Sequence, residues 1–141
     1  MLHSVGVKNY MLETPVKLRP GMSVFEASHL ILSNKISGAV VVDETGHLLG
    51  MVSELDCLRA MLNAVYNGDE FVEGRVEDIM TKDVETAHPH DDIVDVATSM
   101  LDHKHRRRPV VEDGIVVGQL SCRQILRAIK EFGGHVDPTD H

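Results

Sequence analysis

Apolar side chains along this chain follow two different periods, and the two periods alternate in the same order twice. Helical spacing, with apolar residues three and four positions apart, marks two stretches that each begin after a capping residue, Ser23 or Asp92. We therefore predict two amphipathic helices. Their apolar positions are Val24, Ala27, Leu30 and Ile31 in the first, and Ile93, Val96, Ala97, Met100 and Leu101 in the second.

A β-hairpin and then another helix are predicted after each of these helices. Glycine near each hairpin turn supplies the positive φ that tight turns need. The chain is therefore expected to adopt an α+β fold made of two β-α-β-β-α repeats. The extended pieces are Pro15–Leu18 and Val84–Ala87, the hairpins join Ala39–Val42 to Leu48–Ser53 and Arg108–Val111 to Ile115–Ser121, and the last helices are Leu55–Tyr66 and Arg123–Phe132.

The alternation is an internal repeat, because residues 7–61 align with residues 76–129 at an offset of 69. The second copy lacks one residue after Asp113, so the offset is 68 beyond that point. Two such halves are expected to pack about a pseudo-two-fold axis, and a binding site would then occur twice. We expect a first repeat at 7–62, a linker at 63–75, a second repeat at 76–132 and a flexible tail at 133–141. Identical pairs include Val7/Val76, Met11/Met80, Leu32/Leu101, Gly50/Gly118 and Leu58/Leu126.

The composition of the chain excludes some classes of binding partner. The formal net charge is −8, which argues against general binding to nucleic acid or to an anionic membrane. No apolar run approaches the roughly 20 residues that span a bilayer. The two cysteines suggest no disulfide framework, so a cytoplasmic location is expected.

Two matching motifs carry the first candidate chemistry. Ser53 and Asp56 stand three residues apart at a predicted helix start, and Ser121 and Gln124 repeat the spacing. One interpretation is a capping box, in which both side chains satisfy backbone N–H groups. The other adds a ligand, because a helix start suits phosphate and a carboxylate can accept both hydroxyls of a ribose.

The only dense positive run is His103-Lys104-His105-Arg106-Arg107-Arg108-Pro109, which leads into the middle strand of the second repeat. One interpretation is a solvated strand start, or protection of the sheet edge by charge. The other is an anion pocket, because Arg106 and Arg108 would lie on the same side of the strand beside a helix start, with Arg107 on the opposite side. The first repeat has Ser37-Gly38-Ala39 at these positions, where small uncharged residues would let a flat ring approach the backbone.

Both repeats resemble cystathionine-β-synthase (CBS) domains, and the tandem resembles a free-standing Bateman module. In the first copy the resemblance rests on residues 36–43, Gly46, Gly50 and the Ser53–Asp56 motif. In the second it rests on residues 107–111, Gly114, Gly118 and Ser121, and on Met80-Thr81 at its start. It covers residues 7–132.

The resemblance implies a regulatory module that binds AMP, ADP, ATP or S-adenosylmethionine, with no obligatory cofactor. Carried over, Asp56 would bind ribose, Ser53 phosphate, and Ser37, Gly38 and Ala39 the adenine. Gln124 replaces the expected Asp and Val40 the common Pro, so the two sites are expected to be unequal. The remaining candidate ligand residues are Thr14, Val16, Asp83, Val84, Arg106, Arg107, Arg108, Ser121, Arg123 and Gln124.

We therefore predict a homodimer that binds an adenine nucleotide and signals to an unidentified regulated protein. The alternative is a dimeric interaction scaffold with degenerate, ligand-free sites. A small nucleotide hydrolase is a third class, but no nucleophile–base pair supports an enzyme. The pairs His88/His90 and His103/His105 are the densest histidine groups, but no Cys lies at ligand spacing, so no metal site is predicted.

Overall fold

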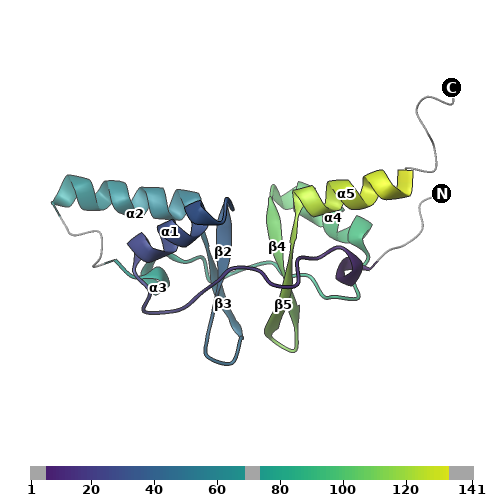
Figure 1. Cartoon of the computed structure of the whole chain (residues 1–141), viewed down its shortest axis with the longest axis horizontal. Helices are drawn as coiled ribbons and strands as arrows, with labels where there is room; N and C mark the ends of the chain where they lie inside the picture. Colours follow the sequence, from purple (N-terminus) through teal and green to yellow (C-terminus); the bar gives the residue numbers. More distant parts are fainter. Residues whose placement is uncertain (1–5, 69–73, 134–141) are drawn as a thin grey trace, which may run out of the picture. The chain divides into compact units, whose positions relative to one another are not determined.

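The computed structural model describes residues 6–68 and 74–133, and it confirms the α+β fold (Figure 1). The predicted helices and hairpin strands are all present, with ends that differ from the expected ones by a residue or two. In chain order the elements are η1 Val7–Asn9, β1 Lys17–Leu18, α1 Val24–Ser33, β2 Gly38–Val42, β3 Leu48–Ser53, α2 Glu54–Asn67, α3 Val76–Ile79, α4 Ile93–His103, β4 Arg107–Glu112, β5 Ile115–Ser121 and α5 Cys122–Gly133.

The chain divides into two compact units whose boundaries differ from those of the sequence repeats. The unit built on the first repeat, here called unit A, contains Pro15–Val84 together with Gly114–Val116. The unit built on the second repeat, unit B, contains residues up to 14, Glu85–Asp113 and the residues from Val117 on. Each unit therefore includes the opening segment of the other repeat.

Unit A holds a three-stranded sheet of order β1-β2-β3, with α1 and α2 packed side by side over it (Figure 1). β1 runs parallel to β2 and pairs Leu18 with Val41, whereas β2 and β3 form the predicted antiparallel hairpin. Alternation along the strands sends one set of side chains toward the helices. The buried core residues are Leu18, Val24, Ala27, Ile31, Ala39, Val41, Val52, Cys57 and Val76.

Unit B repeats this plan with a shorter first strand. Its β4–β5 hairpin carries α4 and α5, but the predicted strand Val84–Ala87 is reduced to one parallel bridge, Ala87 with Val110. That bridge is the counterpart of Leu18 with Val41 in unit A. Pro109 stands where unit A has Val40, and a proline has no N–H with which to extend the ladder. The core of unit B is formed by Val7, Ala87, Ile93, Val96, Met100, Val110, Leu120, Ile125 and Ala128.

The predicted caps of the first helix in each repeat are confirmed, whereas one predicted core position is not. The Ser23 hydroxyl and the Asp92 carboxylate accept backbone N–H groups at the starts of α1 and α4. The prediction that Leu101 lies on the core face of α4 is wrong, because its side chain is 79% exposed, like the 73% of Leu32 in the other copy. Both leucines sit on the outer faces of their helices.

Parts of the predicted linker and tail lie outside the described residues, namely 69–73 and 134–141. α2 continues to Asn67, so residues 63–67 are helical, and Arg75 is the N-cap of α3. Within residues 6–68 and 74–133, no helix is both long and apolar enough to cross a membrane.

Each repeat opens with a lead segment, residues 7–12 in the first copy and 76–81 in the second, that binds to the body of the other copy. In unit B, Val7 N–H donates to the Asp91 carbonyl at 2.9 Å. In unit A, Val76 N–H donates to the Met22 carbonyl at 2.9 Å, which is the same bond at an offset of 69. The leads are therefore exchanged between the repeats.

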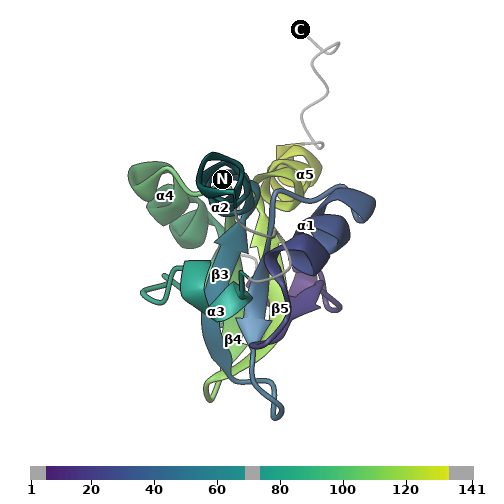
Figure 2. The ribbon, with the colours of Figure 1, turned by 90° about the vertical axis from the view of Figure 1, so that its left-hand side faces the viewer.

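The far end of each lead crosses the last strand of its host hairpin. Thr81 pairs with Met51 on β3, and Figure 2 shows α3 beside that strand. In unit B, Leu12 pairs with Gln119 on β5, with bonds of 2.8 and 2.9 Å between their backbones. The two bridges occupy equivalent positions of the two repeats.

A glycine lies under each crossing. A Cβ atom at Gly50 would lie 2.6 Å from the Thr81 carbonyl oxygen and 2.9 Å from the Met80 sulfur. A Cβ atom at Gly118 would lie 2.6 Å from the Met11 sulfur and 2.9 Å from the Leu12 carbonyl oxygen. These distances are too short for carbon, so the close approach of the lead explains why both copies keep glycine here.

Gly50→Ala is expected to lower the free energy of unfolding by about 1–3 kcal/mol, the usual cost of overpacking, because the rigid Thr81 carbonyl cannot give way. Gly6→Ala is the control, since its φ is −70° and its new Cβ would lie 3.6 Å from the nearest atom, the Pro89 carbonyl oxygen. Urea denaturation of both variants measures the difference. Equal stability of Gly50→Ala and wild type would show that the crossing is not tightly packed.

Candidate functional site

The start of α2 forms a complete capping box. Ser53 Oγ accepts the Asp56 N–H at 3.1 Å, and Asp56 Oδ2 accepts the Ser53 N–H at 2.9 Å. The other carboxylate oxygen, Oδ1, lies 3.5 Å from the Arg59 guanidinium, which is 70% exposed. Each carboxylate oxygen has two lone pairs, so Asp56 retains the capacity to accept bonds from a diol while it caps the helix.

The start of α5 has the same arrangement with an amide in place of the carboxylate. Gln124 Oε1 accepts the Ser121 N–H at 2.7 Å, and Ser121 Oγ accepts the Gln124 N–H at 3.4 Å. Because Oε1 serves the cap, the remaining end of the Gln124 side chain is its NH₂ group, a donor. The capping interpretation is therefore confirmed for both motifs. The hydrogen-bonding group that remains available to a ligand is an acceptor in unit A and a donor in unit B.

The segment before each middle strand is fixed to the same helix start. The Ser37 carbonyl accepts the Glu54 N–H at 2.9 Å, and the Arg106 carbonyl accepts the Cys122 N–H at 3.0 Å. In unit A, Gly38 lies directly opposite Ser53 in the hairpin register, and both Gly38 and Ala39 are buried. The structure thus brings together Ser37, Gly38, Ala39, Ser53 and Asp56 in unit A.

The three consecutive arginines have different environments. Arg106 is exposed, Arg107 opens β4 and is half-buried, and Arg108 is only 3% exposed. The Arg108 guanidinium donates to Ser99 Oγ on α4 at 2.8 Å, so it faces the helix and does not converge with Arg106 on an open pocket. This corrects the expectation that Arg106 and Arg108 form one wall. Of the four arginines predicted to bind the ligand, the exposed ones are Arg106 and Arg123.

Four other candidate residues lie near the points where the chain passes from one unit to the other. Val16 packs against the core of unit A. Thr14 and Asp83 are exposed, and Val84 is half-buried. Thr14 is the last residue of the first stretch of unit B, and Val84 is the last residue of the main stretch of unit A.

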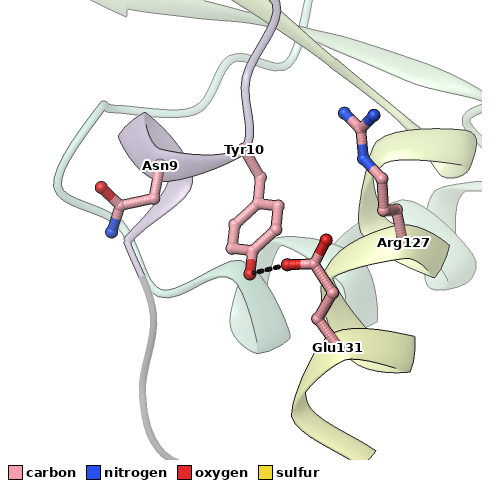
Figure 3. A pocket seen from close by; sticks show the side chains of 4 residues that line it. All are labelled: Asn9, Tyr10, Arg127 and Glu131. Carbon is pink, nitrogen blue, oxygen red and sulfur yellow. Dashed lines mark hydrogen bonds between the residues drawn. The ribbon is translucent and has the colours of Figure 1, made fainter. Parts of the chain in front are cut away.

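Sequence reasoning missed a surface hollow of about 550 Å³ in unit B, lined by Asn9, Tyr10, Arg127 and Glu131 (Figure 3). The Tyr10 hydroxyl donates to Glu131 Oε2 at 2.7 Å and so joins the end of η1 to α5. This hydrogen bond raises the pKa of Tyr10. The one sequence signal for this contact was the aromatic residue Tyr10 within the first lead. None of the predicted ligand residues lines the hollow.

The histidine pairs form ring contacts. The rings of His88 and His90 lie 5.3 Å apart, and those of His103 and His105 lie 5.2 Å apart. In the part of the chain that the structure describes, no three His, Cys, Asp or Glu side chains gather as metal ligands would.

Comparison with known proteins identifies the architecture. The model of the CBS domain family matches residues 7–63 and again 76–131. The chain belongs to the CBS domain family. Both matched segments contain a lead, a hairpin and the capped helix start described above.

Solved CBS pairs share this fold over most of the chain. The CBS domain pair of protein MJ0100, solved with 5′-methylthioadenosine and S-adenosyl-L-methionine, is 28% identical, with a TM-score of 0.75 over 94% of this chain and 99% of that one. CBSX2 in complex with AMP is 29% identical, with a TM-score of 0.78 over 89% and 96% of the two chains.

Among curated proteins, inosine-5′-monophosphate dehydrogenase of Nitrosopumilus maritimus is 36% identical over 118 residues, 82% of this chain and 22% of the dehydrogenase. The chain spans only 22–42% of the length of the first four curated relatives that it matches.

Ser53→Ala is expected to lower the free energy of unfolding by about 0.5–2 kcal/mol, the usual value of an N-cap hydroxyl. Ser121→Ala should cost less, because its bond to the Gln124 N–H is 3.4 Å against 3.1 Å for Ser53. Thermal unfolding of the two variants and of Ser53→Thr, which keeps the hydroxyl, measures the order. A larger loss for Ser121→Ala would contradict the geometry.

Proposed function

We propose that the protein is a regulatory module that binds an adenosyl ligand at the Ser53–Asp56 helix start and passes the signal to a partner protein. The observation that carries the proposal is that Asp56, while capping α2, keeps acceptor capacity next to the small buried residues Gly38 and Ala39. CBS pairs of the same fold bind AMP, S-adenosyl-L-methionine and 5′-methylthioadenosine, which supports this ligand class.

In unit A, the ribose hydroxyls would donate to Asp56. Carboxylates are strong acceptors, and a diol can satisfy both oxygens at once. The adenine ring would lie against the backbone of Ser37, Gly38 and Ala39, whose own side chains are small or absent. The partial positive charge at the N-terminal end of α2 would favour the phosphate or another anionic end of the ligand.

Unit B would favour a different part of the ligand or a different ligand. The group left on Gln124 is a donor, and the neighbouring Arg106 and Arg123 are exposed cations. Donors and guanidiniums suit phosphate better than they suit a ribose diol. We infer that Arg106, Arg123 and Gln124 would select for phosphate charge, with Arg107 beside them at the start of β4.

Ligand binding would change the balance between two arrangements of the repeats, and a partner protein would read the change. We propose that the protein acts as a regulator and not as an enzyme. A cytoplasmic location fits its two free thiols, Cys57 and Cys122.

A homodimer is the second part of the proposal. α2 exposes an apolar stripe with three- and four-residue spacing, the pattern typical of helix–helix association. α5 exposes Leu126, the counterpart of Leu58, and Ile129. The stripe on α2 consists of Leu55, Leu58, Leu62 and Val65, which are 64%, 54%, 47% and 60% exposed.

The interaction scaffold with ligand-free sites remains the competing function. The Gln124 amide favours it, because the second motif caps its helix without offering a ribose acceptor. A dimer that binds its partner equally well with and without nucleotide would support the scaffold.

Asp56→Asn is expected to weaken AMP, ADP, ATP or S-adenosylmethionine binding about tenfold or more, since a hydrogen bond to a charged group contributes about 1.5–3 kcal/mol. The Asn carbonyl can still accept the Ser53 N–H, so stability should change little. Isothermal titration calorimetry measures the affinity, and thermal unfolding controls for the cap.

Gln124→Ala is the matched variant and should change the affinity by less than Asp56→Asn does. Equal effects would argue against unequal sites. If none of the four ligands binds with a Kd below about 1 mM, a binding free energy of roughly −4 kcal/mol, the scaffold is the better hypothesis.

Leu58→Glu is expected to shift the dimer toward monomer in light scattering, because it puts a charge in the middle of the α2 stripe. Thr98→Glu, at an exposed position of α4, is the control for added charge. A wild-type protein that is monomeric at micromolar concentration would contradict the dimer.

A further inference from the structure

Three residues in contact at the end of α4 differ together from their counterparts in the first repeat. Ser99, His105 and Arg108 form a polar cluster in unit B. At an offset of 69 their counterparts in unit A are all apolar. Those counterparts are Leu30, Ile36 and Ala39. The same backbone framework is thus built with an apolar set in one copy and with a charged set in the other.

The guanidinium of Arg108 is buried without a carboxylate. Its two terminal nitrogens bond to Ser99 Oγ at 2.8 Å and His105 Nδ1 at 3.1 Å, and its Nε has no partner. Within the described residues it forms no ion pair. Its partner Ser99 lies near the C-terminal end of α4, where the partial negative charge of a helix favours a cation.

His105 must be neutral for this contact to exist. Arginine only donates, so His105 Nδ1 accepts and its proton lies on Nε2. The ring also stacks on His103 at 5.2 Å. Burial, then the charge of Arg108, then His103 lower the pKa of His105, whereas Glu85 acts weakly in the opposite direction.

The position of His105 is one where an apolar residue is usual. In both copies a lysine in the left-handed conformation, Lys35 or Lys104, follows the first helix. The next N–H donates to a carbonyl five residues earlier. That bond joins Ile36 to Ile31 at 3.1 Å and His105 to Met100 at 2.8 Å. Helix ends of this type commonly carry an apolar contact after the cap, as Ile36 provides.

The cluster is connected to the start of α5. The His105 carbonyl accepts the Cys122 thiol at 3.6 Å, and the next carbonyl, of Arg106, accepts the Cys122 N–H at 3.0 Å. The groups that face His105 are therefore Arg108 on β4, His103 on α4, Glu85 through His103 at 4.0 Å, and the Cys122 thiol on α5.

We propose that the contact between His105 and the buried Arg108 is an acid-sensitive latch, which holds the end of α4 against the starts of β4 and α5. Protonation of His105 removes the acceptor for Arg108 and places two positive charges 3.1 Å apart. A buried guanidinium that has lost this acceptor destabilises the folded state. The segment around His105 therefore moves. Unit A has no counterpart of this device, because Ile36 and Ala39 do not titrate.

The direction of the pH effect follows from the lowered pKa of His105. As the pH falls through about 6.5, the unfolded chain takes up a proton on this ring before the folded protein does. The free energy of unfolding is therefore at its full value above that pH and falls below it. The carboxyls of Asp43 and Glu77, whose pKa values are lowered by the His47 and Gly21 N–H groups, lose their contribution only at more acid pH.

The test is an NMR titration of the wild-type protein combined with thermal unfolding between pH 7.5 and 5.5. The His105 ring is expected to titrate below the midpoint of the same ring in the urea-unfolded protein, and the amide signals of Arg106 and Cys122 should move with that midpoint. His105→Gln keeps an acceptor for Arg108 but cannot take up a proton. It should lose several degrees less in melting temperature over this range than wild type does.

His103→Asn is the matched control, because Asn34 in unit A makes the same bond to a carbonyl four residues earlier, at 2.8 Å in both copies. It should keep most of the acid sensitivity. The triple change Ser99→Leu, His105→Ile and Arg108→Ala installs the set of unit A and should remove it. An ordinary or raised His105 midpoint, or a pH dependence unchanged in His105→Gln, would overturn the latch, and the NMR result stands even if a variant fails to fold.

Discussion

The fold depends on one close approach, where the lead segment of each repeat passes over a glycine in the hairpin of the other. The Thr81 carbonyl and the Gly50 Cα leave no room for a Cβ, and the same holds for Leu12 over Gly118. Because each lead completes the core of the opposite repeat, with Val7 in one cluster and Val76 in the other, neither repeat is a finished domain alone. A single repeat of this length is marginal alone, because small domains bury a smaller share of their surface.

This exchange explains what the sequence could and could not predict. Periods, caps and turn glycines are local signals, so the helices, both hairpins and the Ser23 and Asp92 caps were predictable. The repeat alignment also showed that Gly50 and Gly118 are an identical pair. The residue that requires glycine there lies about thirty positions away in one copy and more than a hundred in the other. Local patterns carry no record of such distant contacts.

The candidate site shows the same division. The capping boxes at Ser53 and Ser121 follow from spacing, and the structure adds which atoms the caps leave available. The direction of Arg108 was not predictable, since alternation along a strand depends on where the strand begins. β4 begins at Arg107, and Arg108 faces α4, where apolar residues are the rule. Leu101 was misplaced for a related reason, because helical spacing alone cannot separate the edge of a core face from the solvent side.

The two copies therefore share one backbone framework and differ in the chemistry of the side chains that it carries. Ala39 and Ile36 show that this framework needs no charge at the end of its first helix, so the desolvation of Arg108 and its unpartnered Nε are a cost that unit B bears and unit A does not. That cost falls on the segment that also carries Arg106 and holds the Cys122 N–H at the start of α5. A charged, titratable cluster in this place ties the packing of α4 to the helix start where Ser121 and Gln124 lie. The asymmetry between the copies thus extends from the exposed residues that would meet a ligand into the core that positions them.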